Sequence, residues 1–473
     1  MSEPCEKKQV FFDSLAPDRR YWKRRNRSYH RSLAELVRFV IPPGSRVLEI
    51  GCGTGELLAA SEPAYGVGVD FSSKMIELAS RKLTGLKFIQ ADAHNLNIEE
   101  KFDYVIMSDT IGHLEDVQTC LENLHKVTTS GSRILITHYS KLWFPAVSLA
   151  EKLRLKSPEG LQNWLSIADI DNLLDLAGFE AVTRGKRFLF PFDIPLIGSL
   201  CNRIFANLPL INRLCLIQYV IARPKPEVEP RRGKDCKVSV IVPTLNEAGN
   251  IDNLIDRLPQ MGISVETIFI DGHSTDGTVD KITEAIAKNP DRDIKFAYQP
   301  GRGKADAVFT GFEMATGQVL MILDSDLTVE PEDLTKFYRA LIDGTGEFVN
   351  GCRLIYPLEK EAMRTLNYLG NCFFSVVFSW LLGQRIKDTL CGTKALFKAD
   401  YDRLKRSDPL FGTVDPFGDF ELLFGAAKLS LKIVEMPVRY HQRYYGQIKI
   451  RRFKHGMILL KMCIQGARRI KFI

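Results

Sequence analysis

No two cysteines in this 473-residue sequence have the spacing of a zinc site or of a CxxC redox pair. The ten cysteines are scattered along the chain without a regular interval. Cysteines placed in this way provide no disulfide framework, and they fit the reducing conditions of a cytoplasm. We therefore expect free thiols and a fold that does not depend on a cysteine-bound metal.

The sequence also has no apolar segment that is clean enough to cross a membrane, and no apolar leader. The longest apolar run, residues 366–383, is interrupted by Asn367, Gly370, Asn371 and Ser375. A membrane span needs about 20 consecutive apolar residues, so this run predicts a buried or interfacial helix. The N-terminal segment has none of the apolar core of a signal peptide, so we expect a cytoplasmic protein.

The composition, with 45% hydrophobic and 26% charged residues, indicates neither disorder nor a fibrous array. A chain of this length exceeds one ordinary core, and roughly two domains are expected. Three prolines and dense charge in residues 224–236 predict an exposed linker between them. On either side, β-branched runs alternate with helical stretches, which is typical of parallel α/β sheets.

Positive charge is concentrated at the C-terminal end. Residues 431–473 contain eleven Lys or Arg and one acidic residue, while the net charge of the whole chain is +7. Apolar residues alternate with these cations, and residues 451–473 therefore predict an amphipathic tail on anionic lipid. A solvated tail or a nucleic-acid contact is the alternative, but apolar side chains would serve no purpose against a phosphate backbone. We expect a peripheral protein on the inner face of the cytoplasmic membrane, with no nucleic acid bound.

A glycine-rich turn marks the first half. Three glycines come two residues apart directly after an apolar segment: Gly51, Gly53 and Gly55. Glycines in a strand-to-helix turn let backbone N–H groups approach a ligand, although a tight turn alone would also use them. The next two predicted strands end at Asp70 and Asp92. A carboxylate at the end of the second strand is suited to accept both hydroxyls of a ribose.

With Glu49 before the glycines, this turn has the ExGxGxG signature and resembles class I S-adenosylmethionine-dependent methyltransferases. The resemblance covers residues 39–223, after a basic helical extension at residues 1–38. It implies a Rossmann-like domain in which the glycines hold the methionine part of the cofactor and Asp70 holds the ribose. It further implies that Asp92 and Ala93 contact the adenine.

Two further features of the first half each have two interpretations. His113, just beyond the fourth predicted strand, is a candidate general base for methyl transfer, or a structural histidine that caps a loop. Residues 190–215 form an apolar insertion punctuated by proline. This insertion is either a lid or membrane-facing patch over a lipid-linked acceptor, or a surface that packs on the second domain.

The second half contains the sharpest chemical motif of the chain. Asp324, Ser325 and Asp326 directly follow a buried apolar run. Two carboxylates spaced by one residue at the end of a strand can hold Mg²⁺ or Mn²⁺ against a diphosphate. Such a cation stabilises the charge that grows on a departing nucleotide. A lone DxD is uninformative, but three strand-and-turn elements precede this one.

These elements resemble family 2 glycosyltransferases of the GT-A fold over residues 237–450. The resemblance implies a nucleotide-sugar donor, linked to GDP or UDP, and inversion at the anomeric carbon. It assigns the metal motif to Asp324 and Asp326. It assigns the donor site to Pro243, Asn246, Glu247, Asp271, Lys304, Asp324, Ser325 and Asp326.

The motifs further downstream are similar to those of the dolichyl-phosphate mannose synthase group of polyprenyl-phosphate glycosyltransferases. They include four cationic residues suited to bind an acceptor phosphate: Arg353, Arg364, Arg443 and Lys449. A phosphomonoester is mostly dianionic at neutral pH and needs no general base. Asp419 and Glu421 are candidate bases if the acceptor is a sugar hydroxyl, or partners of nearby arginines.

The sequence therefore predicts a bifunctional enzyme, with transfer of a sugar to a polyprenyl phosphate and adenosylmethionine-dependent methylation of a related molecule or glycan. Cell-surface polysaccharide assembly is one setting for such a pair. Two alternatives stay open. The second domain could extend a lipid-linked or polymeric glycan at a hydroxyl, or the first domain could be a non-catalytic module that only binds adenosylmethionine.

Overall fold

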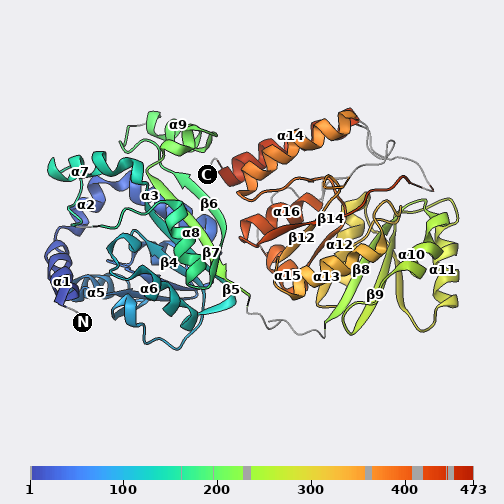
Figure 1. The fold of residues 1–473 in the computed structure, drawn as a ribbon, viewed down its shortest axis with the longest axis horizontal. Helices are drawn as coiled ribbons and strands as arrows, with labels where there is room; N and C mark the ends of the chain where they lie inside the picture. Colours follow the sequence, from blue (N-terminus) through green and yellow to red (C-terminus); the bar gives the residue numbers. More distant parts are fainter. Residues whose placement is uncertain are drawn as a thin grey trace. The chain divides into compact units, whose positions relative to one another are not determined.

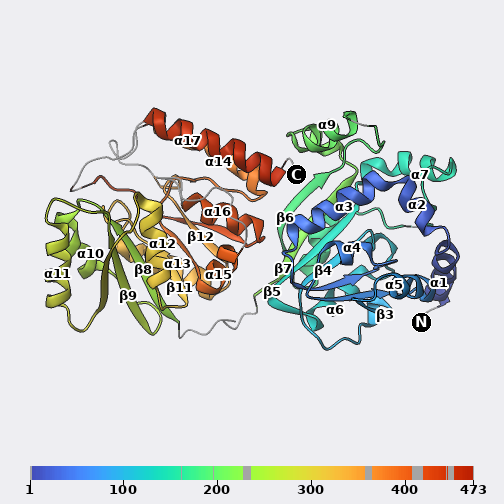
Figure 2. The same ribbon diagram turned by 180° about the vertical axis from the view of Figure 1, so that it is seen from behind.

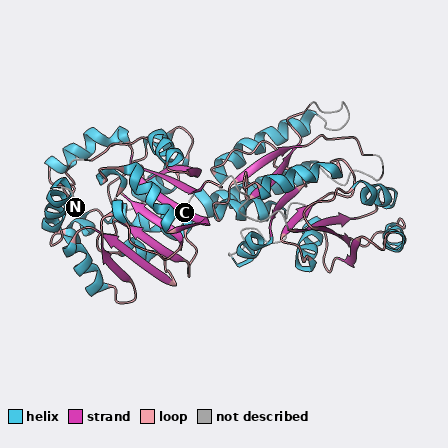
Figure 3. Ribbon diagram, turned by 60° about the horizontal axis from the view of Figure 1, so that its bottom comes forward, coloured by secondary structure: helices cyan, strands magenta, loops and turns pink. Residues whose placement is uncertain are grey.

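The computed structural model describes residues 3–160, 162–194, 196–226, 236–356, 365–406, 419–443, 445 and 452–471. The chain divides into two compact units, which we call unit 1 (residues 1–225) and unit 2 (residues 226–470). Each unit has one seven-stranded sheet with helices packed against it (Figures 1, 2 and 3). The predicted pair of α/β domains is confirmed. Most of the predicted linker, residues 227–235, lies outside the described residues.

The sheet of unit 1 has the strand order β3-β2-β1-β4-β5-β7-β6. The strands are β1 (Arg46–Ile50), β2 (Tyr65–Asp70), β3 (Lys87–Gln90), β4 (Phe102–Ser108), β5 (Thr128–Tyr139), β6 (Phe179–Arg187) and β7 (Ile217–Pro224). The first five are parallel, but β7 runs antiparallel to both β5 and β6. The sheet is therefore mixed, because β7 returns between β5 and β6 instead of entering after a crossover helix.

The helices of unit 1 are α1 (Glu3–Leu15), α2 (Arg19–Arg25), α3 (Arg27–Val40), α4 (Glu56–Ala60), α5 (Ser73–Lys82), α6 (Val117–Asn123), α7 (Phe144–Lys152), α8 (Ile167–Leu176) and α9 (Ile197–Arg203). Successive residues of the central strands enter different cores: Leu48 belongs to one apolar cluster and Val47 to another. This explains why the central strands are largely apolar on both faces. Leu36, Val37 and Val40 of α3 join the Val47 cluster. Residues 1–38, predicted as an extension, thus contribute α1 to α3 to unit 1.

The sheet of unit 2 has the order β10-β9-β8-β11-β13-β12-β14. Its strands are β8 (Lys237–Thr244), β9 (Ser264–Asp271), β10 (Asp293–Tyr298), β11 (Val319–Ile322), β12 (Phe348–Cys352), β13 (Lys394–Phe397) and β14 (Ile433–Pro437). Strand β13 is antiparallel to both β11 and β12, so this sheet is mixed as well. Its helices are α10 (Ile251–Arg257), α11 (Thr278–Lys288), α12 (Lys304–Met314), α13 (Leu334–Ile342), α14 (Thr365–Leu382), α15 (Lys398–Arg406), α16 (Asp419–Lys428) and α17 (Arg452–Gly466).

The longest apolar run of the sequence forms α14, and among the described helices none is long and apolar enough to cross a membrane. The basic tail begins with α17, which lies against α14 (Figures 1 and 2). Leu459 and Met462 of α17 are buried, whereas Met457 and Ile464 are exposed. The tail therefore uses part of its apolar surface inside unit 2 and leaves another part exposed.

Candidate active sites

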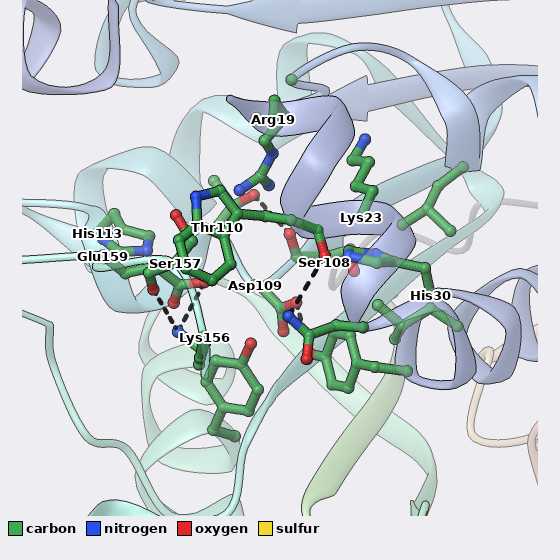
Figure 4. A pocket seen from close by; sticks show the side chains of 18 of the residues that line it. Arg19, Lys23, His30, Ser108, Asp109, Thr110, His113, Lys156, Ser157 and Glu159 are labelled. Atoms are coloured by element: carbon green, nitrogen blue, oxygen red, sulfur yellow. Dashed lines mark hydrogen bonds and ion pairs between the residues drawn. The ribbon is translucent and has the colours of Figure 1, made fainter. Parts of the chain in front are cut away.

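Unit 1 contains a cavity of about 1520 Å³ at the carboxyl ends of its central strands. Residues that directly follow β1, β2, β3 and β4 line it, together with residues of α2, α3 and α7. Figure 4 shows part of this lining, with Arg19 and Lys23 of α2, His30 of α3 and Asp109 after β4. The crevice outside the carboxyl ends of the strands is where open α/β sheets bind ligands. The predicted cofactor residues that line this cavity are Glu49, Gly51, Gly53, Asp70, Asp92 and Ala93.

The glycine loop after β1 depends on conformations that other residues rarely adopt. Gly51, Gly53 and Gly55 have φ values of 71°, 52° and 76°. A side chain at Gly51 would also overlap Thr110, whose hydroxyl donates a 2.9 Å hydrogen bond to the carbonyl of Ile50. The loop is therefore tight for two reasons, its backbone conformation and the element packed on it.

Asp70, at the end of β2, holds this loop in place. Its Oδ2 accepts a 2.8 Å hydrogen bond from the Gly53 amide, and its Oδ1 accepts one of 2.9 Å from the Ser72 amide. The carboxyl group is nearly inaccessible, and burial raises its pKa above the usual range of an aspartate. The side chain lines the cavity, so a ribose hydroxyl would compete with or add to these amide contacts.

Glu49 and Asp92 are also engaged with the backbone. The Oε2 atom of Glu49 accepts a 2.9 Å hydrogen bond from the Leu58 amide in α4, and burial raises the pKa of Glu49 to about 8. Asp92 accepts a 3.0 Å bond from the His94 amide and lies 2.6 Å from His94 Nδ1. These contacts fix both acidic side chains at the edge of the cavity.

Asp109 is a cavity residue that the sequence motifs did not reveal. It follows β4 with a φ of 55°, and Tyr29 of α3 donates a 2.6 Å hydrogen bond to its Oδ2. Its Oδ1 is buried and has no hydrogen-bond partner among the described residues. Burial raises the pKa of Asp109 to about 7. A carboxyl group with that pKa can accept a proton near neutral pH. Its only sequence signal was its position after the fourth strand.

His113, the predicted general base, lies in the same cavity (Figure 4). Its ring packs edge-on against Phe12 with 5.2 Å between ring centroids, and burial lowers the pKa of His113. The negative charge of Glu159 opposes this effect in part, and Glu159 is itself paired with Lys156 at 2.9 Å. Burial therefore favours the neutral form of His113, and it also makes the ring a weaker base than a free imidazole.

The N-terminal helices cover the glycine loop. Lys23 of α2 donates a 2.8 Å hydrogen bond to Thr54 Oγ1 and forms an ion pair with Glu56 at the start of α4. Arg19 also lines the cavity, and its Nε is buried without a hydrogen-bond partner in the described part of the chain. The predicted basic extension is thus part of the site.

In unit 2 the DxD motif follows β11, and each of its carboxylates is paired with a cation. Asp324 forms an ion pair with Lys304, the first residue of α12. Asp326 forms one with Arg443. The pKa of Asp324 is lowered by Lys304, with smaller contributions from Lys394 and Arg353, against the opposing effect of burial. The motif is therefore surrounded by positive charge.

Arg443 connects the DxD motif to the turn after β8. Besides Asp326, it contacts Glu247 at 3.3 Å. Glu247 is buried, and its Oε2 accepts a 2.8 Å hydrogen bond from the Asn250 side chain. Ser325, between the two aspartates, donates a 2.9 Å bond to the carbonyl of Pro243. Residues far apart in the sequence therefore form one polar cluster at the carboxyl ends of β8 and β11.

The turns after β8 and β9 support each other. Asn246 has a φ of 50°, and its Oδ1 accepts a 2.8 Å hydrogen bond from the Thr275 amide. The backbone amide of Asn246 donates a 2.8 Å hydrogen bond to the Ser274 hydroxyl. Asp271 Oδ2 accepts a 2.8 Å bond from the Ser274 amide. These predicted donor-site residues are thus brought together as a rigid pair of turns.

Arg353 lies beside this cluster but is occupied by a buried carboxylate. Its Nε and one terminal nitrogen bind the two oxygens of Asp388 at 2.7 and 2.8 Å. Burial would raise the pKa of Asp388, but the ion pair with Arg353 outweighs this effect and lowers that pKa to about 2. Asn371 of α14 donates a further 2.9 Å bond to Asp388. Arg353 is a predicted phosphate ligand. In this structure, however, its guanidinium group binds Asp388 and so holds the loop that carries this aspartate.

That loop returns to the DxD motif at Gly392. A side chain at Gly392 would overlap both Asp324 and the Lys304 ammonium group. Arg364 and Lys449, and the side chain of Asp419 at the start of α16, lie outside the described residues. Glu421 is half-buried on α16. Their predicted roles therefore stay predictions.

The donor set of the DxD motif fits a hard divalent cation, since two carboxylates at a strand end are oxygen ligands. The described residues contain no group of three or more His, Cys, Asp or Glu side chains that could hold a metal. Asp324 and Asp326 would therefore supply two protein ligands, and phosphate oxygens and water the remainder. This is the arrangement expected of a cation that binds together with a nucleotide diphosphate.

Comparison with protein families gives one match in each unit. Residues 21–184 match a family described as methyltransferase domain, and residues 239–404 match glycosyl transferase family 2. The chain is a methyltransferase domain fused to a family 2 glycosyltransferase domain. The methyltransferase domain is of the adenosylmethionine-dependent kind, and the relatives of the glycosyltransferase domain include hexosyltransferases.

The individual relatives each match one domain. Glycosyltransferase AglJ of Haloferax volcanii is 30% identical over 210 residues, 44% of this chain and 64% of that protein. Dolichol-phosphate mannosyltransferase of Pyrococcus furiosus is 35% identical over 111 residues, 23% of this chain and 31% of that protein. Phosphoethanolamine N-methyltransferase 2 of Caenorhabditis elegans is 28% identical over 170 residues, 34% of this chain and 39% of that protein. The chain spans less than two thirds of the length of each.

One solved structure that is similar to the methyltransferase domain is an adenosylmethionine-dependent methyltransferase of Thermotoga maritima, described as a possible histamine N-methyltransferase. It is 18% identical, with 46% of this chain and 99% of that chain covered and a TM-score of 0.37.

Proposed function

We propose that the glycosyltransferase domain transfers a hexose from a nucleotide sugar to a polyprenyl phosphate, and that the methyltransferase domain methylates the resulting glycolipid or a closely related molecule. The observation that supports the first part is the ion-paired cluster of Asp324, Asp326, Lys304 and Arg443 after β11. It combines two carboxylates that are suited to a divalent cation with two side chains suited to phosphate. Dolichol-phosphate mannosyltransferases are among the relatives of this domain.

In this proposal Asp324 and Asp326 would hold Mg²⁺ or Mn²⁺, which would supply positive charge for the diphosphate of the donor. Lys304 and Arg443, which pair with the two aspartates in the structure, are suited to bind phosphate oxygens as well. The acceptor phosphate is already ionised at neutral pH, so it attacks the anomeric carbon without a general base. Asp271, Asn246 and Glu247 shape the donor pocket through the turns after β8 and β9.

In the methyltransferase domain, the glycine loop and Asp70 would hold adenosylmethionine in the cavity at the ends of β1 to β4. The cofactor would supply an electrophilic methyl group there, and Tyr29 and His113 line the same cavity, which the acceptor would enter. Methyl transfer of this kind depends chiefly on positioning. Asp109 or His113 takes the proton that the acceptor loses.

The first test uses purified protein with radiolabelled GDP-mannose, UDP-glucose or UDP-GlcNAc, a divalent cation, and undecaprenyl or dolichyl phosphate. We expect label in the organic phase as a lipid-linked sugar with one of these donors. Label on an oligosaccharide alone would show that the domain extends a glycan at a hydroxyl.

The second test adds S-adenosylmethionine with a labelled methyl group after the sugar has been transferred. We expect the methyl label to migrate with the glycolipid. Titration calorimetry with S-adenosylhomocysteine provides the matching binding measurement. A protein that binds S-adenosylhomocysteine but methylates nothing in this mixture would separate cofactor binding from the proposed acceptor.

A further inference from the structure

The methyltransferase domain has an apolar surface that its fold does not use. The surface consists of α7 with the turn before it and the insertion between β6 and β7, which holds α9. Figures 1 and 2 show α7 and α9 along the same edge of this unit. The exposed apolar residues on it include Leu142, Phe144, Leu149, Leu153, Phe192, Leu196, Ile197, Leu200, Leu210 and Leu214. We call this surface the apolar edge.

Two leucines of the apolar edge are held outward by a strained backbone. Leu196 is 86% exposed with φ 64° and ψ −52°, and Leu210 is 74% exposed with φ 72° and ψ −53°. The turn at Leu210 is closed by a 3.0 Å hydrogen bond from the Ile211 amide to the Pro209 carbonyl. Each leucine is the middle residue of a separate Pro-Leu-Ile sequence, at residues 195–197 and 209–211. Non-glycine residues rarely adopt this conformation, and strain of this kind is characteristic of functional positions.

The segments of the apolar edge are fixed to each other. Trp143 Nε1 donates a 2.7 Å hydrogen bond to the Leu214 carbonyl, which ties the start of α7 to the end of the insertion. Arg27 of α3 pairs with Asp193 at 2.5 Å, which ties the other end of the insertion to α3. The outward leucines are therefore part of an ordered surface.

The charge around the apolar edge is positive. The exposed cationic residues in segments 19–27 and 141–156 are Arg20, Arg24, Arg25, Arg27, Lys141, Lys152 and Arg154. Arg203 and Arg213 of the insertion are exposed, and its one acidic residue, Asp193, is neutralised by Arg27. Apolar side chains bordered by cations match an anionic bilayer, where the apolar groups enter the acyl chains and the cations contact head groups.

The apolar edge also continues into the cofactor cavity. Leu149, Leu153 and Leu155, together with Phe190 and Phe192 of the insertion, line that cavity as well. An amphiphile could therefore pass from the lipid surface to the polar floor near Asp109 without leaving apolar contact. We infer that the methyltransferase domain docks on an anionic membrane through the apolar edge and takes its acceptor directly from the lipid.

Flotation of the full-length protein with vesicles tests this inference. Vesicles of phosphatidylcholine with phosphatidylglycerol are compared with vesicles of phosphatidylcholine alone. The wild-type protein floats with the anionic vesicles, and the double variant Leu196→Glu with Leu210→Glu associates roughly tenfold less or weaker still. Leu176→Glu is the matched control, because Leu176 is 57% exposed but precedes β6, whereas the insertion follows it. This control floats like the wild type.

Titration with S-adenosylhomocysteine shows whether each variant keeps its fold. The pair Leu196→Gly with Leu210→Gly, which suits the backbone of both turns, must also lose flotation. Unchanged flotation of either double variant would overturn the inference, since the C-terminal tail would then account for lipid binding. A change in sedimentation without a change in flotation would assign the surface to a second copy or to the glycosyltransferase domain instead. Flotation needs no sugar donor, so its failure would leave the proposed sugar transfer intact.

Discussion

Asp388 and Arg353 form a buried ion pair whose contribution can be separated from catalysis. Replacing Asp388 by Ala leaves the Arg353 charge buried without its partner, and such losses cost about 3–5 kcal/mol. We therefore expect Asp388→Ala to speed amide hydrogen exchange strongly in β12 and β13, measured by mass spectrometry. Glu332→Ala is the control, because Glu332 pairs with Arg257 on the surface and its loss costs about 1 kcal/mol or less. Equal effects of the two variants would show that the buried pair does not hold this loop.

Glu49 gives the methyltransferase domain a pH dependence. The carboxyl group titrates near 4.5 when unfolded and near 8 in the folded domain, because it is buried. Its stabilising contribution is complete below pH 4.5 and is lost as the pH rises through 8, at up to about 1.4 kcal/mol per pH unit. Glu49→Gln removes this loss. We expect the unfolding temperature of the variant, relative to that of the wild type, to rise as the pH is raised from 5 to 8. A constant difference across that range would contradict the raised pKa.

At the scale of single residues, local motifs predicted which residues lie in the sites better than they predicted the hydrogen-bond and ion-pair partners of those residues. Gly51 and Gly53 could be identified because a strand-to-helix turn is encoded within a few residues. The pairing of Tyr29 with Asp109 joins residues 80 positions apart, and no local pattern encodes it. The same holds for Arg353, whose suitability for a phosphate was evident from its chemistry, while its engagement by Asp388 depended on the folded loop.

Among the elements, the insertion between β6 and β7 has a backbone conformation that lowers its stability without burying the side chains concerned. Leu196 and Leu210 adopt a sparsely populated backbone conformation that costs roughly 1–3 kcal/mol each, and both remain exposed. We expect Leu196→Gly with Leu210→Gly to leave the unfolding temperature of this domain unchanged or to raise it, even though apolar side chains are removed. Differential scanning calorimetry measures this directly. A fall of several degrees would mean that the leucines stabilise the fold and are not held outward for another purpose.

The elements themselves followed from pattern where burial is two-sided. Continuous apolar runs such as residues 104–107 and 319–323 became central strands because helices cover both faces. The direction of β7 and β13 could not be predicted in this way. The composition of a buried strand does not reveal whether it runs parallel or antiparallel to its neighbours. Residues 1–38 were predicted as a separate extension because their cationic side chains hid the apolar face of α3.

At the scale of the whole molecule, the two domains have separate cores and separate sites. We expect S-adenosylhomocysteine to raise the unfolding temperature of one thermal transition and a nucleotide diphosphate with Mn²⁺ to raise that of another. A ligand at 100 times its dissociation constant adds about 2.7 kcal/mol to the domain that binds it. Asp326→Ala should remove the nucleotide shift and leave the other unchanged. Loss of both shifts in this variant would show that the domains do not fold and bind independently.

The central claim is that the aspartate pair after β11 directs a sugar to a phosphate. The most direct measurement offers the protein its labelled nucleotide sugar with a polyprenyl phosphate or with the corresponding polyprenol, which differs only in the acceptor group. We expect a labelled lipid from the polyprenyl phosphate alone, dependent on Mg²⁺ or Mn²⁺ and abolished by Asp326→Ala. Equal labelling of the polyprenol, or labelling of the phosphate that survives Asp326→Ala, would contradict it.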